Sequence, residues 1–105
     1  MPLLIRLSLL LVGLAVPAVA ISATSAQIKI DNFTFGPAQL MVEKGTAVTW
    51  TNDDDIPHSI VFSGVGVRSK ALDTEKSFTY QFDKVGTFSY ICGLHPQMHG
   101  KIVVQ

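Results

Sequence analysis

The chain has 105 residues, eight Lys or Arg against eight Asp or Glu, and a single cysteine, Cys92. This length allows one domain of ordinary size. The even charge balance gives no basis for nucleic-acid binding. One cysteine cannot form an internal disulfide, and it cannot supply the two thioether bonds of a c-type haem.

The N-terminal residues have the pattern of a secretory signal. A positive charge at Arg6 precedes residues 7–21, which are apolar except for Ser8. This run is shorter than the ~20 residues that a spanning helix needs, and small residues follow it. We therefore expect a signal peptide over residues 1–26, cleaved between residues 20 and 26, with an uncleaved membrane anchor as the alternative. The domain at 27–105 should be periplasmic or otherwise exported, without stable membrane insertion after cleavage.

From Gln27 onward, apolar residues recur with a period of two, as in half-buried strands. Turn-forming residues separate these runs. The pattern predicts an all-β domain of about seven to eight short antiparallel strands, arranged as a two-sheet sandwich or a closed barrel. Residues 64–75 are the least patterned and are interpreted as a long loop. The alternating pairs or triplets are Ile28/Ile30, Leu40/Val42, Val48/Trp50, Ile60/Phe62, Phe78/Tyr80/Phe82, Phe88/Tyr90 and Ile102/Val104.

The same alternation predicts the direction of two reactive side chains. His58 has the parity of Ile60 and Phe62, and Cys92 has the parity of Phe88 and Tyr90. Because side chains on one face of a strand are two residues apart, both should point inward at strand ends. They are more than 30 residues apart in sequence, yet they can meet at one end of the sandwich.

A thiolate, an imidazole and a thioether follow at three-residue intervals in Cys92, His95 and Met98. One tight loop can present all three to a point, where His58 supplies a fourth ligand. Two imidazoles, a thiolate and a weak thioether are the donor set of a mononuclear blue-copper centre. Taken singly, each residue also has a structural interpretation: a surface histidine, a core methionine, a buried cysteine. Their joint occurrence in an exported all-β domain favours copper.

Two neighbouring features are expected to stay outside the ligand set. His99 follows Met98 directly, and consecutive residues usually point in different directions, so we expect a solvated histidine. The acidic run Asp53 to Asp55 is interpreted as a solvated turn, and only secondarily as a docking or repelling feature for a partner.

The sequence resembles the cupredoxins, or type 1 blue-copper proteins, over essentially all of residues 27–105. The resemblance implies a Greek-key β-sandwich and one copper ion alternating between Cu(I) and Cu(II), with His58, Cys92, His95 and Met98 in the ligand positions. It also implies a monomeric carrier that shuttles electrons between larger redox proteins. The motifs are residues 33–38 (FTFGPA), 42–54 (VEKGTAVTWTNDD), 56–59 (IPHS), Phe78 and 86–104 (GTFSYICGLHPQMHGKIVV).

Details of the ligand loop refine this resemblance. Two residues separate Cys92 from His95 and two separate His95 from Met98. This short loop is most similar to that of the amicyanins, which implies an amine dehydrogenase as donor and a c-type cytochrome as acceptor. Ser59 stands where many relatives have Asn, which leaves the tether of the ligand loop open.

Other functions fit less well. An enzyme would need an open metal position or a nucleophile with its base, and four ligands fill this site. Thioether is a poor ligand for structural zinc. The remaining alternative is a copper-binding module for copper storage or delivery. For electron exit, we expect the outer edge of His95 to reach solvent through an apolar patch of Gly93, Leu94 and Pro96.

Overall fold

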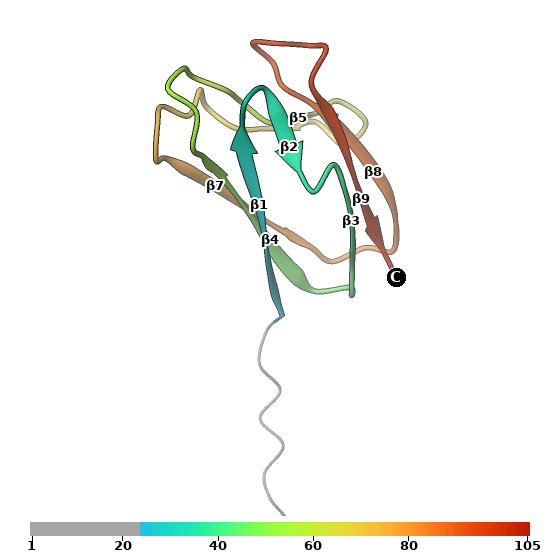
Figure 1. Cartoon of the computed structure of the whole chain (residues 1–105). Coiled ribbons are helices and arrows are strands. Elements are labelled where there is room, and N and C mark those ends of the chain that lie inside the picture. The colour runs from blue at the N-terminus through green and yellow to red at the C-terminus, as the bar shows by residue number, and fades with distance from the viewer. Residues whose placement is uncertain (1–23) are drawn as a thin grey trace, which may run out of the picture.

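The computed structural model describes residues 24–105, so the expected signal peptide lies almost entirely outside the described residues. Within the described part, no helix is long and apolar enough to cross a membrane. The chain there forms nine strands (Figure 1): β1 (Ser25–Asp31), β2 (Thr34–Gly36), β3 (Gln39–Val42), β4 (Thr46–Asn52), β5 (Val61–Phe62), β6 (Val67–Arg68), β7 (Ser77–Phe82), β8 (Gly86–Ile91) and β9 (His99–Val104).

The strands make two sheets, which confirms the all-β sandwich and decides against a closed barrel. One sheet has the order β2-β1-β4-β7, and the other has the order β3-β9-β8-β5-β6. The strand count of nine slightly exceeds the expected seven to eight, because β2 and β6, with three and two residues, are too short to show an alternating pattern. Strand β6 lies inside the segment 64–75, which the sequence had indicated as loop only.

Not every neighbouring pair of strands is antiparallel, so that part of the expectation was wrong. Strands β1 and β4 pair in parallel, and so do β3 and β9. Both parallel pairs follow from the path of the chain, which crosses from one sheet to the other after β2 and returns after β3. Residue alternation reports which face a side chain occupies, and it carries no information on the direction of the neighbouring strand.

The core lies between the sheets and is built by the alternating residues. Strand β4 shows the pattern most clearly, with Thr46, Val48, Trp50 and Asn52 buried and the residues between them half-buried. Trp50 is fully buried at the centre, with aromatic neighbours on the facing sheet. Each such large apolar side chain contributes roughly 1.5–3 kcal/mol when fully buried.

The elements that carry the expected ligands meet at one end of this sandwich. Cys92 directly follows β8, and the loop to β9 contains His95 and Met98. His58 lies between β4 and β5 and forms an isolated bridge with Leu72. Figure 1 shows the loop between β8 and β9 at the same end as the turn between β1 and β2. The fold therefore brings segments that are distant in sequence to a common point.

Candidate metal centre

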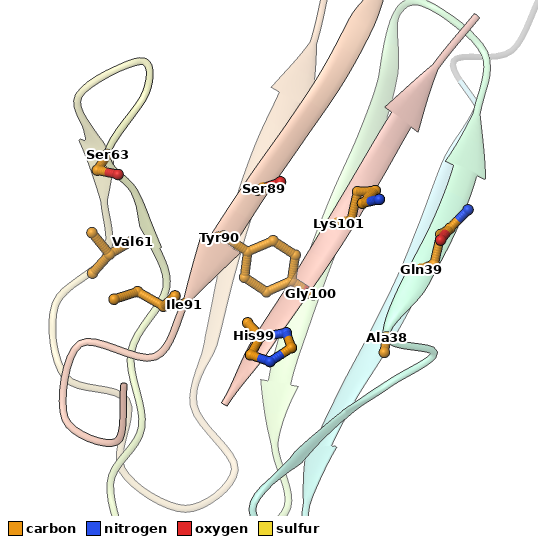
Figure 2. Close-up of a pocket in the computed structure, with 10 residues that line it drawn as sticks. All are labelled: Ala38, Gln39, Val61, Ser63, Ser89, Tyr90, Ile91, His99, Gly100 and Lys101. Atoms are coloured by element: carbon orange, nitrogen blue, oxygen red, sulfur yellow. The ribbon is translucent and has the colours of Figure 1, made fainter. Parts of the chain in front are cut away.

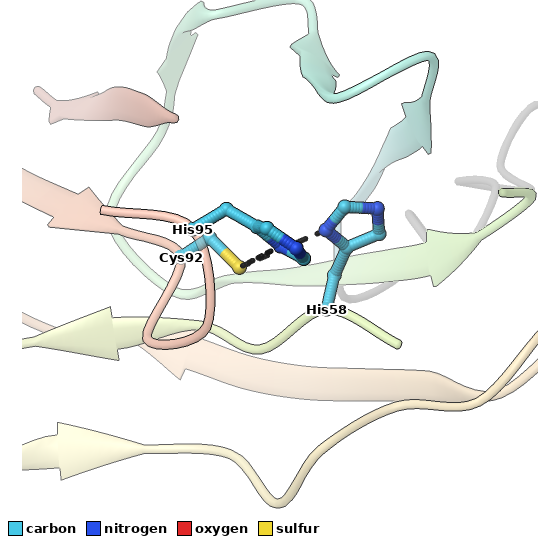
Figure 3. Close-up of side chains that lie close together, drawn as sticks. All are labelled: His58, Cys92 and His95. Carbon is cyan, nitrogen blue, oxygen red and sulfur yellow. Dashed lines mark hydrogen bonds between the residues drawn. The ribbon is translucent and has the colours of Figure 1, made fainter. Parts of the chain in front are cut away.

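Three of the four expected ligand residues lie together. The ligand atoms of His58, Cys92 and His95 are all within 4.8 Å of one another. His58 and Cys92 have no exposed surface, as their inward parity predicts, and His95 is half-buried. Figure 3 shows both imidazole rings directed at the Cys92 sulfur. Within residues 24–105, this is the single cluster of metal-binding side chains.

The spacing of the ligand atoms fits a shared metal ion. Nδ1 of His58 and Nδ1 of His95 each lie 3.7 Å from Cys92 Sγ. For a divalent first-row ion such as zinc, bonds of about 2.0 Å to nitrogen and 2.3 Å to sulfur that meet at roughly 110–120° place these atoms about 3.5–3.7 Å apart. Two nitrogens and one thiolate at this spacing are the principal donors of a blue-copper site. The residues present therefore fit copper.

Asp54 orients the His58 ring. Its Oδ2 lies 2.8 Å from Nε2 of His58, on the side of the ring away from Cys92. A carboxylate there holds the proton on Nε2 and leaves the Nδ1 lone pair free for a metal, as carboxylate partners of metal-binding histidines do. The loop around Asp54 is itself fixed, because the Asn52 side chain accepts from the Asp54 N–H and donates to the carbonyls of Ile56 and Leu72.

The role of Asp54 corrects the interpretation of Asp53 to Asp55 as a wholly solvated turn. Asp53 and Asp55 are exposed, whereas Asp54 is buried. The backbone N–H groups of Phe33 and Asn32 donate to its carboxylate at 3.0 and 2.8 Å. The hydrogen bond from Phe33 is the largest cause that lowers the pKa of Asp54; burial opposes it, and Asn32 and His58 add to the lowering. The carboxylate is therefore held ionised.

The Cys92 sulfur and the ligand loop are tethered by Ser59. The Ser59 N–H donates to Cys92 Sγ at 3.3 Å, and the Ser59 hydroxyl accepts from the Gly93 N–H at 2.9 Å. Serine thus makes the link to the loop that the sequence left open. The approach is close: a Cβ at Gly93 would lie 2.7 Å from Ser59 Oγ and 3.1 Å from a Val61 methyl carbon. Glycine is required at this position for that reason.

Met98 is buried beside Cys92 in the core cluster. The Cys92 N–H donates to the Met98 carbonyl at 3.0 Å, and the Met98 N–H donates to the His95 carbonyl at 2.9 Å. These two bonds close the loop, so the three-residue spacing produces one tight turn. The turn brings the backbone of Met98 next to that of Cys92.

His99 faces a different part of the molecule. It begins β9 opposite Ile91 and is exposed. It lines a groove of about 540 Å³. Figure 2 shows its side chain near residues of neighbouring strands such as Gln39 and Lys101. It does not belong to the cluster of ligand atoms around Cys92.

Phe33, like Asp54, lies next to the cluster, although the sequence motifs predicted no role for it at the metal centre. Its ring packs edge-on against the imidazoles of both His58 and His95, at centroid distances of 5.6 and 5.2 Å. Phe33 is 46% exposed, and Leu94 in the ligand loop is 50% exposed. Phe33 contacts the half-buried His95 and Leu94 precedes it in the chain, so both exposed apolar residues are neighbours of this histidine.

Comparison with known proteins agrees with this fold and site. A family model described as a cupredoxin-like domain matches residues 4–104. The chain is 38% identical to amicyanin-alpha of Methylorubrum extorquens over 88 residues, covering 79% of this chain and 74% of the relative. It is 34% identical to a chloroplastic plastocyanin of Tetradesmus obliquus over 105 residues, covering 84% and 72% of the two chains.

Solved structures agree as well. A purple cupredoxin from Nitrosopumilus maritimus superposes with a TM-score of 0.70 at 33% identity, covering 76% of this chain and 99% of that one. An amicyanin variant in the Cu(I) state superposes with a TM-score of 0.74 at 28% identity, covering 77% and 82%.

The fold and the donor set define a small copper-binding β-sandwich, and the chain belongs to the cupredoxin-like family. Its cofactor is one copper ion, and its function is the transfer of single electrons, as in the cupredoxins that it resembles.

Proposed function

We propose that His58, Cys92, His95 and Met98 are the four copper ligands of an exported electron carrier. The observation that carries this assignment is the placement of both Nδ1 atoms 3.7 Å from Cys92 Sγ, with the far nitrogen of His58 already bonded to Asp54. Copper bound there would supply a one-electron couple between Cu(I) and Cu(II).

The residues around the ligands keep the site from rearranging when the charge of the ion changes. Asp54 fixes the His58 ring, and Ser59 restrains both the sulfur and the loop. Supporting hydrogen bonds of this kind hold metal ligands in place and tune their basicity. In our proposal, Met98 is a weak axial donor that shifts the balance between the two oxidation states.

We infer that electrons enter or leave at the His95 edge. His95 is the residue of the cluster with solvent exposure; the exposed ring of Phe33 packs against it, and the exposed Leu94 is its neighbour in the chain. Redox partners typically meet over small interfaces, which allow rapid release. An apolar contact next to a partly exposed ligand serves that requirement.

The proposed partners are an amine dehydrogenase as donor and a c-type cytochrome as acceptor. The similarity to amicyanins and the two-residue spacings of the ligand loop support this choice. We infer that the protein has no enzymatic activity of its own, because four protein ligands leave no metal position for a substrate. We also infer that it acts as a monomer.

We propose export to the periplasm, with cleavage of the leader no later than Ala23, in the first part of the expected range of residues 20–26. Ser25 and Ala26 pair with Ala47 and Val48 of β4, and the Thr24 carbonyl accepts from the Ala47 N–H at 3.0 Å. Cleavage after Ala20 or Ala23 keeps this pairing, whereas cleavage after Ala26 removes it. N-terminal sequencing of the exported protein tests the position.

The deciding experiment is copper loading of the mature protein, followed by its visible spectrum and voltammetry. A carrier should be intensely coloured as Cu(II) and should show a reversible one-electron wave. Colourless, loosely held Cu(I) without a reversible wave would favour the alternative of copper storage or delivery.

A further inference from the structure

Phe33 is almost half exposed, yet its ring packs against two side chains of the metal centre. The plane of the ring makes angles of 89° and 87° with the imidazoles of His58 and His95. Such edge-to-face contacts are favourable, so the ring has a preferred place against both ligand side chains. Phe33 comes from the turn between β1 and β2, and its own side chain offers no metal donor.

The turn that carries Phe33 is held in a backbone conformation that bulky residues rarely adopt. Asn32 has φ of 52° and Phe33 has φ of 58°, so two consecutive non-glycine residues are left-handed. Strained backbone of this kind persists only where surrounding contacts enforce it, and it is concentrated at functional sites.

The enforcing contact is the carboxylate of Asp54. It accepts from the N–H groups of Asn32 and Phe33 at 2.8 and 3.0 Å. The oxygen that accepts from Phe33 also accepts from Nε2 of His58, at 2.8 Å. One buried carboxylate therefore fixes a ligand ring and, through the strained turn, the aromatic ring that lies on it.

In the described part of the chain, His95 is the member of the cluster that solvent reaches. Cys92 and His58 have no exposed surface, whereas His95 is half-buried and contacts Phe33. A small molecule that approaches the ligand atoms from solvent therefore meets the edge of His95 and the ring of Phe33 first. Removing the ring would open this side without removing a ligand.

We propose that Phe33 is a cap over the metal centre, held by Asp54, that keeps external ligands and chelators from the copper ion. This proposal rests on the copper assignment above and adds a positioning residue to it. A capped site retains its ion during repeated docking, which suits a carrier and opposes copper delivery.

The test compares the copper-loaded parent with Phe33→Ala and with Phe33→Tyr, which keeps the ring. Removal of Cu(I) by excess bicinchoninate should be about tenfold faster in the alanine variant, because the packing of the ring against two imidazoles is lost. The tyrosine variant should stay close to the parent. Azide should perturb the Cu(II) spectrum at lower concentration in Phe33→Ala than in either ring-bearing protein.

Met41→Ala is the matched control. Met41 is 57% exposed on β3 and pairs with Val103, near the end of β9 opposite the ligand loop. Its truncation removes exposed apolar surface of comparable size, so parental rates are expected. If Met41→Ala releases copper as fast as Phe33→Ala, general loosening explains the effect and the cap is overturned.

The metal-free protein gives a second readout. In its NMR spectrum, the ring protons of His58 and His95 should shift in Phe33→Ala, since the ring current of Phe33 is lost, and should stay in place in Met41→Ala. Unmoved histidine signals would overturn the contact itself. If Phe33→Ala does not fold, Phe33→Leu replaces it in both experiments. Faster copper release and shifted ring-proton signals of His58 and His95 are then expected in Phe33→Leu.

The outcomes separate the two proposals. A parent protein that takes up no copper refutes the metal assignment. A parent that is intensely coloured, with equal release rates in all variants, refutes the cap alone.

Discussion

Replacing Asp54 with asparagine should destabilise the metal-free protein much more than the same change at Asp53. The Asp54 carboxylate accepts three hydrogen bonds, from Asn32, Phe33 and His58. An asparagine side chain keeps one oxygen acceptor. Its amide nitrogen would take the place of the other oxygen, where it cannot accept a hydrogen bond and would face an N–H donor. Hydrogen bonds to charged groups contribute about 1.5–3 kcal/mol each, so the loss of one or two should cost roughly 2–4 kcal/mol.

The matched control is Asp53→Asn, which removes the same charge one residue earlier. Asp53 makes an ion pair with Lys29 at 3.8 Å, and the two side chains are 39% and 65% exposed. Exposed pairs of this kind contribute about 0–1 kcal/mol. Urea and thermal unfolding of the metal-free variants near pH 7 measure both effects. For a domain of this size, 2 kcal/mol corresponds to a fall in Tm of about 8–16 °C. Equal stability of the two variants would refute the role assigned to Asp54.

The pH dependence of folding stability is a second test of the role of Asp54. The folded-state pKa of Asp54 lies below its usual value of 3.8, mainly because the Phe33 N–H donates to the carboxylate. A carboxyl group with a lowered folded pKa stabilises the protein above its unfolded pKa, and this stabilisation is lost as the pH falls through the folded value. The stability difference between the parent and Asp54→Asn should therefore shrink below about pH 4. A difference that stays constant from neutral pH to well below pH 4 would contradict this argument.

Changes at the ligands and the loop give further expectations. Cys92→Ser should abolish the intense visible absorption of the Cu(II) protein, since that colour needs a thiolate ligand; an unchanged spectrum would refute the site. Met98→Leu should retain copper and raise the reduction potential measured by voltammetry, because removing a donor disfavours Cu(II). Leu94→Glu should slow electron exchange with a partner in stopped-flow mixing and leave the visible spectrum nearly unchanged. Ser59→Ala should lower stability by about 0.5–1.5 kcal/mol in urea unfolding, because the hydrogen bond from the exposed Gly93 N–H to the Ser59 hydroxyl is lost.

Much of the fold could be predicted from the sequence because the relevant signal is local. Alternation places Ile28, Val48 and Trp50 on the inward face, and all three are buried. The same rule turned His58 and Cys92 inward, and both are fully buried. The direction of neighbouring strands is not local, so the parallel pairing of β1 with β4 could not be predicted from alternation.

For the site, too, the local features could be predicted from the sequence and the long-range contacts could not. The intervals between Cys92, His95 and Met98 are visible in the sequence, and they predict a single loop. Asp54 gave no such signal, because it stands between two other aspartates and differs from them only in its contacts. Those contacts are with a turn more than 20 residues earlier in the chain. Phe33 belongs to that turn, and its backbone conformation appears only in the structure.

The distribution of rigidity around the centre favours a carrier over a store. His58 and Cys92 are fully buried, and a hydrogen bond restrains each of them. Asp54 holds the His58 ring at Nε2, the nitrogen away from the cluster, and the Ser59 N–H donates to the Cys92 sulfur itself. A protein that releases copper to others needs a ligand that can turn away from the ion at little cost. Here His95 alone has solvent exposure, and Phe33 packs against its ring. In the proposed assignment, an electron would leave through the edge of His95 without movement of these residues, whereas release of the ion would require His95 and the Phe33 ring to move.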